Sequence, residues 1–198
     1  MRRRRLLAAL GGVVTGGLAG LAGCVQRRAS GGAPLSVSSP ALTDGGRLPD
    51  RYGCEGEGVS PPLTVESRPD PTAALAVVAE ADLGVFNKPL FWVVWNLPAD
   101  TERIPEGVPR TATVASLDGA RQSSQPGTEP GYDPPCPPLG RKTTLLFDTF
   151  ALEEPLDLEG NAPAEAAEEA VTRTQLASTR ISVTYTRPAE GTDGTRTG

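Results

Sequence analysis

The sequence predicts a mainly β domain with one late helix, and three observations carry this prediction. Several short apolar runs have the length of strands and are separated by turn residues. The 198 residues include 23 glycines and 20 prolines, as expected where many turns connect short strands. One segment alone, 164–178, has the composition of a helix.

Six segments have strand character: 35–38, 63–65, 73–79, 91–95, 144–152 and 181–185. The first and last alternate between apolar and polar residues, which is typical of a strand with one exposed face. The runs 73–79 and 91–95 are continuously apolar and 144–152 is largely so; all three therefore need cover on both faces and should be buried. These three runs predict the central strands of a sandwich.

The helix should begin after Asn161, which can cap it, and Pro163, which suits a first turn. Residues 164–178 are rich in Ala, Glu, Gln and Leu. Glu165, Glu168 and Glu169 lie in the first turns, where the helix dipole favours acidic side chains.

The amino terminus resembles an export signal. Arg2 to Arg5 precede a Gly/Ala/Leu/Val run that ends at Gly23, so residues 1–23 are interpreted as a removable signal peptide of the twin-arginine type. Residues 21–24 (LAGC) resemble a lipobox, which would place lipid on Cys24. The alternative is an uncleaved transmembrane anchor over 6–23. Both interpretations put the protein on the outer face of the cell membrane.

The remaining chain divides into three parts. Residues 24–34 form a polar linker without periodicity, 35–187 form one domain, and 188–198 are Gly/Thr-rich and expected to be disordered. After removal of Arg2 to Arg5, 15 basic and 24 acidic side chains remain, a net charge of −9. Such an acidic surface excludes a nucleic-acid partner. Lys88 and Lys142 are the two lysines, which fits either salt adaptation or GC-rich coding.

Histidine is absent from the chain. This excludes His-based catalytic triads, His metal sites and imidazole acid–base chemistry. Ser60, Ser123 and Ser124 therefore have no histidine base, and none lies in a Gly-x-Ser-x-Gly segment. We expect no enzymatic activity, no metal and no cofactor.

Five segments, in the order and at the spacing typical of one family, resemble motifs of the phosphatidylethanolamine-binding, or Raf-kinase-inhibitor-like, family in its bacterial and archaeal branch. They are LPDRYGCEG (48–56), VSPPL (59–63), WVVWNLPA (92–99), GYDPPCPP (131–138) and FDTFAL (147–152). The resemblance covers about 35–187. It implies an antiparallel β-sandwich, a large sheet on a small one, with one or two short C-terminal helices.

The resemblance also implies a surface pocket for phosphate or a phospholipid headgroup. In the family this pocket has an Asp-Pro-Asp turn, two histidines, a Gly-Pro loop and an aromatic ring. The corresponding ligand-binding residues here are Glu80, Asp82, Phe91, Tyr132, Pro135 and Thr143.

Several of these positions depart from the family pattern. Phe91 and Thr143 replace the two histidines, and Pro134 replaces the glycine before Pro135. Glu80 and Asp82 would repel an anion, although Arg141 and Lys142 could offset this if they point inward. We expect a shallow, more apolar pocket that no longer prefers anions, with Phe91 filling part of it or belonging to the core.

Two cysteines remain besides Cys24. Cys54 and Cys136 lie in matched family segments of an exported chain, which favours a disulfide between them. Two separate buried thiols are the alternative.

The leading functional hypothesis is a membrane-tethered binding or inhibitory protein with a degenerate anion pocket. A cell-surface hydrolase and a structural envelope lipoprotein without a ligand are the alternatives. The candidate partners are the membrane, through lipid on Cys24, a small molecule or headgroup, and a protein target. A screen for stabilising ligands and for turnover would separate the three hypotheses.

Overall fold

The computed structural model describes residues 33–84 and 87–188. The predictions of a signal peptide, of lipid on Cys24, of most of the linker and of a disordered tail after Pro188 lie outside these residues. Within them, no helix has the length and hydrophobicity needed to cross a membrane.

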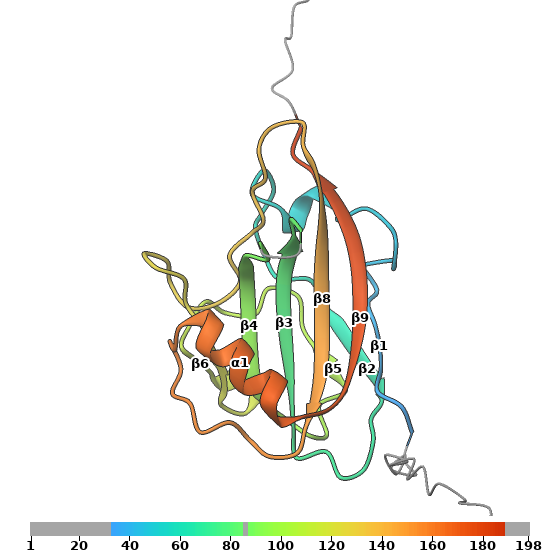
Figure 1. The fold of residues 1–198 in the computed structure, drawn as a ribbon, viewed down its shortest axis with the longest axis vertical. Helices are drawn as coiled ribbons and strands as arrows, with labels where there is room; N and C mark the ends of the chain where they lie inside the picture. The colour runs from blue at the N-terminus through green and yellow to red at the C-terminus, as the bar shows by residue number, and fades with distance from the viewer. Residues whose placement is uncertain (1–32, 85–86, 189–198) are drawn as a thin grey trace, which may run out of the picture.

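Two antiparallel sheets form the domain (Figure 1), which confirms the predicted mainly β sandwich. The large sheet has the strand order β6-β7-β4-β3-β8-β9. Its strands are β3 (Ala74–Asp82), β4 (Leu90–Pro98), β6 (Thr113–Val114), β7 (Ala120–Gln122), β8 (Lys142–Leu152) and β9 (Gln175–Thr186). The small sheet has the order β1-β2-β5, with β1 (Ser36–Ser38), β2 (Leu63–Ser67) and β5 (Arg103–Ile104).

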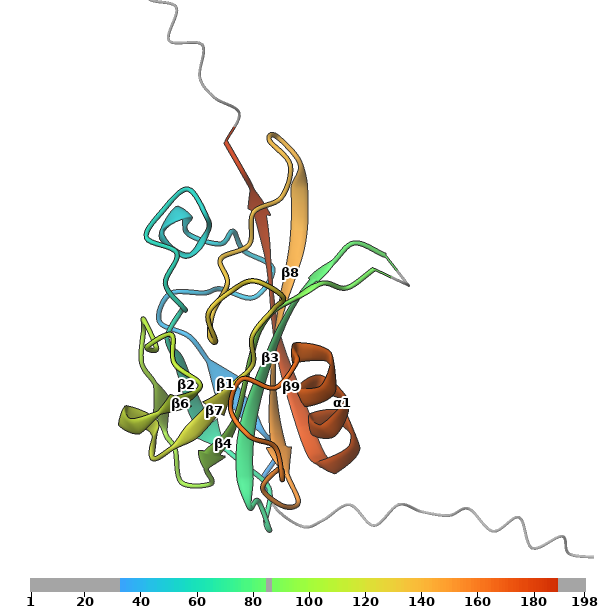
Figure 2. The ribbon, with the colours of Figure 1, turned by 90° about the vertical axis from the view of Figure 1, so that its left-hand side faces the viewer.

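Three helical segments complete the domain: the α-helix α1 (Ala164–Thr174) and the single 3-10 turns η1 (Asp50–Tyr52) and η2 (Ala115–Leu117). Figure 2 shows α1 on one side of the large sheet and the small sheet on the other. The large sheet is therefore the middle layer.

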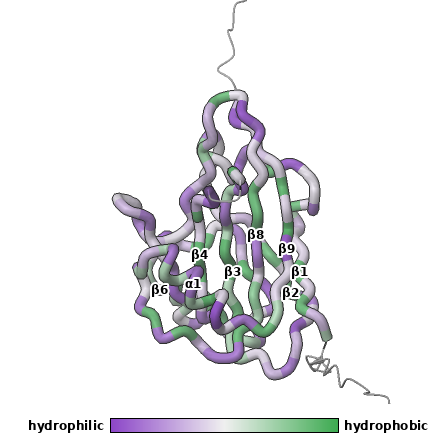
Figure 3. The backbone as a smooth tube through the Cα atoms, viewed as in Figure 1, coloured by the Kyte–Doolittle hydropathy of each residue, from purple (hydrophilic) through white to green (hydrophobic). Residues whose placement is uncertain are grey.

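The continuous apolar strands are covered on both faces, as predicted. Leu75, Val77 and Ala79 of β3 point into the interior between the two sheets. Ala76 and Val78 lie on the opposite face, in the cluster that packs against α1. Figure 3 shows hydrophobic segments along these central strands and hydrophilic ones in the loops. Alternate residues thus serve two cores.

The helix prediction was correct at its start, Ala164, and wrong in the capping residue and at the C-terminal end. Pro163 is the N-cap residue and its side chain makes no capping bond, while Asn161 lies two residues earlier with φ 71°. The helix ends at Thr174, and residues 175–178 belong to β9. There Ala177 pairs with Ala151 of β8, so strand pairing with β8 overrides the helix propensity of this segment.

The two ends of the large sheet carry different parts of the chain. Antiparallel pairing places the end of β3 and the starts of β4 and β8 at one end of the molecule. The described chain begins at the opposite end (Figures 1 and 2), where the Ser67 hydroxyl donates to the Pro34 carbonyl oxygen at 2.6 Å.

Candidate functional site

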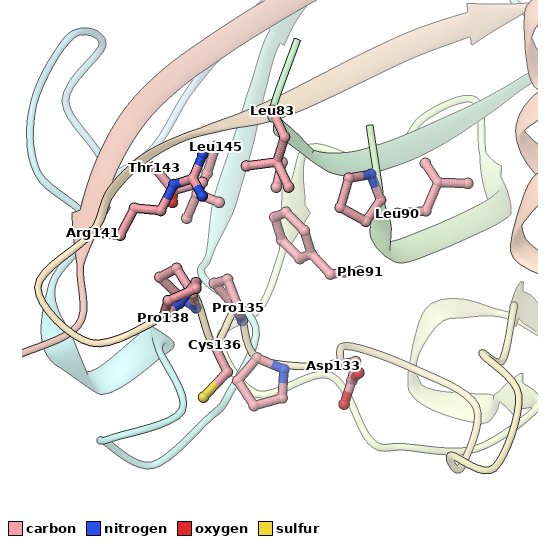
Figure 4. A pocket seen from close by; sticks show the side chains of 14 residues that line it. Leu83, Leu90, Phe91, Asp133, Pro135, Cys136, Pro138, Arg141, Thr143 and Leu145 are labelled. Atoms are coloured by element: carbon pink, nitrogen blue, oxygen red, sulfur yellow. The ribbon is translucent and has the colours of Figure 1, made fainter. Parts of the chain in front are cut away.

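A pocket of about 390 Å³ opens at the end of the sandwich where β8 begins (Figure 4). Its walls come from the end of β3, the start of β4, the start of β8 and the proline-rich segment 133–138. Ten of its fourteen lining residues are apolar: Ala81, Leu83, Pro89, Leu90, Phe91, Pro134, Pro135, Pro137, Pro138 and Leu145. Asp133, Cys136, Arg141 and Thr143 complete the lining.

A β-bulge turns Phe91 into this pocket. Ala79 of β3 pairs with Trp92, whereas the next residue, Glu80, pairs with Leu90, so Phe91 is an extra residue in β4. Consequently both Phe91 and Trp92 belong to the interior cluster, despite being neighbours on one strand. The ring of Phe91 lies edge-on to Tyr132 and Phe147, with ring centroids 5.8 and 5.6 Å apart. Phe91 is therefore a core aromatic and a pocket wall at once.

Thr143 lies beside this wall on the interior face of β8. It is 4% exposed and pairs with Tyr185 of β9. Within the described residues, neither the Thr143 Oγ1 atom nor the Tyr185 hydroxyl has a hydrogen-bond partner, although both are buried. Such buried unpaired hydroxyls are uncommon in native proteins.

The proline-rich segment is fastened to the η1 region. Cys136 forms a disulfide with Cys54, with a Cα–Cα distance of 5.3 Å, which confirms the predicted pairing. The Cys54 N–H also donates to the Pro135 carbonyl oxygen at 3.3 Å. Gly58, at φ +64°, approaches so closely that a Cβ atom would lie 3.0 Å from Pro134 Cγ. These contacts hold one wall of the pocket in place.

One cation lines the pocket. Arg141 extends its guanidinium beside Thr143 and Leu145 (Figure 4), and it forms no ion pair with any described residue. Lys142, the next residue, does not line the pocket, because neighbouring residues of a strand point to opposite faces. At the rim, Asp133 is 3.8 Å from the Arg110 guanidinium.

The sequence comparison decides the family. A model described as phosphatidylethanolamine-binding protein matches residues 38–186, three quarters of the chain. The chain belongs to the phosphatidylethanolamine-binding protein (PEBP) family. The pocket described above contains Phe91 and Thr143, the two residues that the motif resemblance matched to family histidines.

Two similar sequences and one similar solved structure accompany this match. The UPF0098 protein of Methanothermobacter thermautotrophicus is 32% identical over 153 residues, covering 77% of this chain and 99% of that protein. A Mycobacterium tuberculosis protein named as a lipoprotein, LppC, is 30% identical; the match covers 77% of this chain and 72% of that protein. The crystal structure of Escherichia coli YbcL, described as a member of the mammalian PEBP family, superposes with a TM-score of 0.71 at 25% identity. The match covers 78% of this chain and 99% of YbcL.

Glu80 and Asp82 do not line the PEBP pocket, contrary to the sequence-based expectation. Ala81 and Leu83 line it, so the alternation of β3 directs Glu80 and Asp82 to the opposite face of the sheet. There Glu80 Oε1 accepts from Lys88 Nζ at 3.0 Å, and Asp82 Oδ1 accepts from the Gly84 N–H at 3.1 Å. The repulsion of an anion expected from these two acids is therefore absent from the pocket lining.

Tyr132 also lies outside the lining. It is 1% exposed beneath Phe91, and its hydroxyl donates to the Tyr52 carbonyl oxygen at 2.7 Å. Burial raises the pKa of Tyr132 strongly. Tyr132 therefore supports the pocket floor instead of contacting a ligand. Of the six predicted residues, the structure brings Phe91, Pro135 and Thr143 together.

A polar groove lies on the other face of the large sheet, beside α1. Its lining includes Glu80 with Lys88, and Asp148 with Arg180. Arg180 donates two hydrogen bonds to Asp148, at 2.6 and 2.7 Å, and these bonds raise the pKa of Arg180. The carboxylates of Glu80 and Asp148 are thus each neutralised by a neighbouring cation.

Two other candidate sites have structural explanations. Ser60 Oγ is buried and accepts a hydrogen bond from the Val108 N–H at 2.9 Å, so it braces a loop. In the described part of the chain, one cluster of potential metal ligands occurs, formed by Cys54, Glu55 and Cys136. Its two sulfur atoms are bonded to each other and so are not thiolate ligands.

Proposed function

We propose that this PEBP-family protein is exported, anchored by lipid on Cys24, and binds a small apolar ligand in the pocket beside Phe91 without catalysing a reaction. The observation that carries the proposal is the lining itself, in which ten of fourteen residues are apolar. A concave, mostly apolar surface with a few polar groups is the usual form of a small-molecule site.

Phosphate is a poor candidate for this pocket. Phe91 and Thr143 occupy the two positions where the family motifs have histidines. Four prolines in the wall, Pro134, Pro135, Pro137 and Pro138, have no N–H group to donate. Oriented backbone N–H groups and cationic side chains are what phosphate sites require, so a binding role with an apolar ligand fits these residues better.

Calorimetric titration of the mature chain tests the binding role. An uncharged apolar probe, 1-octanol, should bind, whereas phosphate and phosphoethanolamine should not. The double variant Phe91→His with Thr143→His should gain phosphate binding, and more strongly below pH about 6.5, where imidazole is charged. Tight phosphate binding by the natural chain would refute the proposal, as would a failure of octanol to bind.

The proposed anchor has a separate test. The basic start, the apolar run and the LAGC segment before Cys24 support it, as does the relative named as a lipoprotein. Cys24→Ser should release the protein from membranes or leave it unprocessed, measured by fractionation of the producing cells. Normal cleavage with unchanged membrane retention would contradict lipid attachment at this residue.

A further inference from the structure

We propose that the ligand of this pocket is an amphipathic monocarboxylate, whose apolar body lies against Phe91 and the proline wall while its carboxylate pairs with Arg141. This inference rests on the proposed function of the pocket and adds the chemical class of the ligand.

Arg141 is placed to receive an anionic group. Seven of the ten described arginines form an ion pair within the domain, but Arg141 does not. Its guanidinium lies over an apolar pocket beside Thr143 (Figure 4). A low-dielectric wall strengthens the attraction between such a cation and an incoming anion. The unpaired guanidinium is therefore the natural anchor for one charged end of a ligand.

The chemistry of the lining favours a carboxylate over a phosphate dianion. A guanidinium presents parallel N–H groups that match the two oxygens of a planar carboxylate. One cation compensates one negative charge, and Asp133 at the rim opposes a second. The proline wall contributes no ring of N–H donors that could hold further phosphate oxygens.

The rest of the pocket fits an apolar body. Its volume of about 390 Å³ is well above the roughly 150 Å³ of an apolar cavity that accepts benzene. A medium-length acyl chain or a substituted aromatic ring therefore fits between Phe91 and the prolines. Leu83, 40% exposed at the edge of the pocket, offers additional apolar surface to such a chain.

Three matched probes test the inference: octanoate, 1-octanol and acetate, each titrated into residues 24–198 carrying Cys24→Ser, so that no detergent is needed. We expect octanoate to bind about tenfold more tightly than octanol, because a hydrogen bond to a charged group adds roughly that factor. Acetate should not bind measurably. The advantage of octanoate over octanol should shrink as the salt concentration rises.

Two variants locate the charge. Arg141→Gln should abolish the preference, so that the variant binds octanoate and octanol with equal affinity, and its remaining octanol binding shows that the pocket is still formed. Lys142→Gln removes an equal charge from the neighbouring residue outside the lining and should change nothing. Equal binding of octanoate and octanol by the natural chain, or no effect of Arg141→Gln, would overturn this inference and leave the apolar binding role intact. Binding of neither compound would overturn both.

Discussion

Thr143 combines a buried position with an unpaired hydroxyl. It lies on the interior face of β8 at 4% exposure, and its Oγ1 atom has no partner among the described residues. Leaving a buried hydroxyl unpaired costs about 1–3 kcal/mol. Thr143 therefore lowers the stability of the domain, because its hydroxyl is buried without a hydrogen bond. It does so at a position that lines the pocket.

Thr143→Val should raise the free energy of unfolding by about 1 kcal/mol, because it replaces the unpaired hydroxyl with a methyl group of similar size. Chemical denaturation of the mature chain measures this change. Thr144→Val, on the opposite face of the same strand, is the control and should stay within about 0.5 kcal/mol of the natural chain. A clear loss of stability in Thr143→Val would show that the hydroxyl is hydrogen-bonded in solution.

At the residue level, sequence reasoning found half of the predicted pocket. Phe91, Pro135 and Thr143, which the family resemblance placed in the pocket, all line it. The error at Glu80 and Asp82 came from ignoring strand alternation, since the same pattern that puts Ala81 in the pocket puts both acids outside it. The bulge at Phe91 left no signal in the sequence, because it depends on how β4 pairs with β3.

Among the elements, the proline-rich wall is unusual in how little backbone bonding it can make. Four of the six residues in 133–138 are prolines, which donate no backbone hydrogen bond. The Cys54–Cys136 disulfide and the bond from the Cys54 N–H to Pro135 tie it to the η1 region. The position of this wall therefore depends heavily on one covalent link.

Removal of the disulfide by the double change Cys54→Ser with Cys136→Ser should lower the free energy of unfolding by about 4 kcal/mol, because the link closes a long loop. The two cysteines are 82 residues apart. Urea denaturation with and without a dithiol reductant measures the effect. The natural chain should weaken on reduction, whereas the double variant should not respond. Equal stability of the oxidised natural chain and the variant would contradict this account.

Sequence patterns predicted the long strands better than the element boundaries. Strongly apolar runs identified β3, β4 and most of β8, since burial on both faces leaves a strong signal. The strands β5, β6 and β7 have two or three residues each and were not predicted, because none of them lies in an apolar or clearly alternating segment. The end of α1 was missed because residues 175–178 pair with β8.

For the whole molecule, all three tyrosines of the chain are buried. Burial, together with the hydrogen bond to Glu106, raises the pKa of Tyr52 to about 12. Burial also raises the pKa values of Tyr132 and Tyr185 above their ordinary value of 10.0. Each ring is therefore harder to ionise in the folded chain than in the unfolded chain.

Stability should consequently fall as the pH rises above about 10. The unfolded chain loses tyrosine protons near that pH while the folded chain keeps them, so alkaline conditions favour unfolding. Well below pH 10 the three tyrosines are protonated in both states, so their ionisation should add no pH dependence to the stability. Tyrosinate absorbance and circular dichroism should change together in one transition. A tyrosine that ionises near pH 10 while the circular dichroism stays native would contradict the burial of all three rings.

The position of the pocket at one end of the sheet determines what it can meet. The chain enters the domain at the other end, beside Pro34 and Ser67. The nine residues of β3 span roughly 30 Å between these ends. If lipid is attached to Cys24 as proposed, the membrane would be joined through the predicted linker to the entry end of the domain, opposite the pocket. Its ligand would then arrive from the surrounding fluid or from a facing protein, and the protein's own membrane would be its least accessible source.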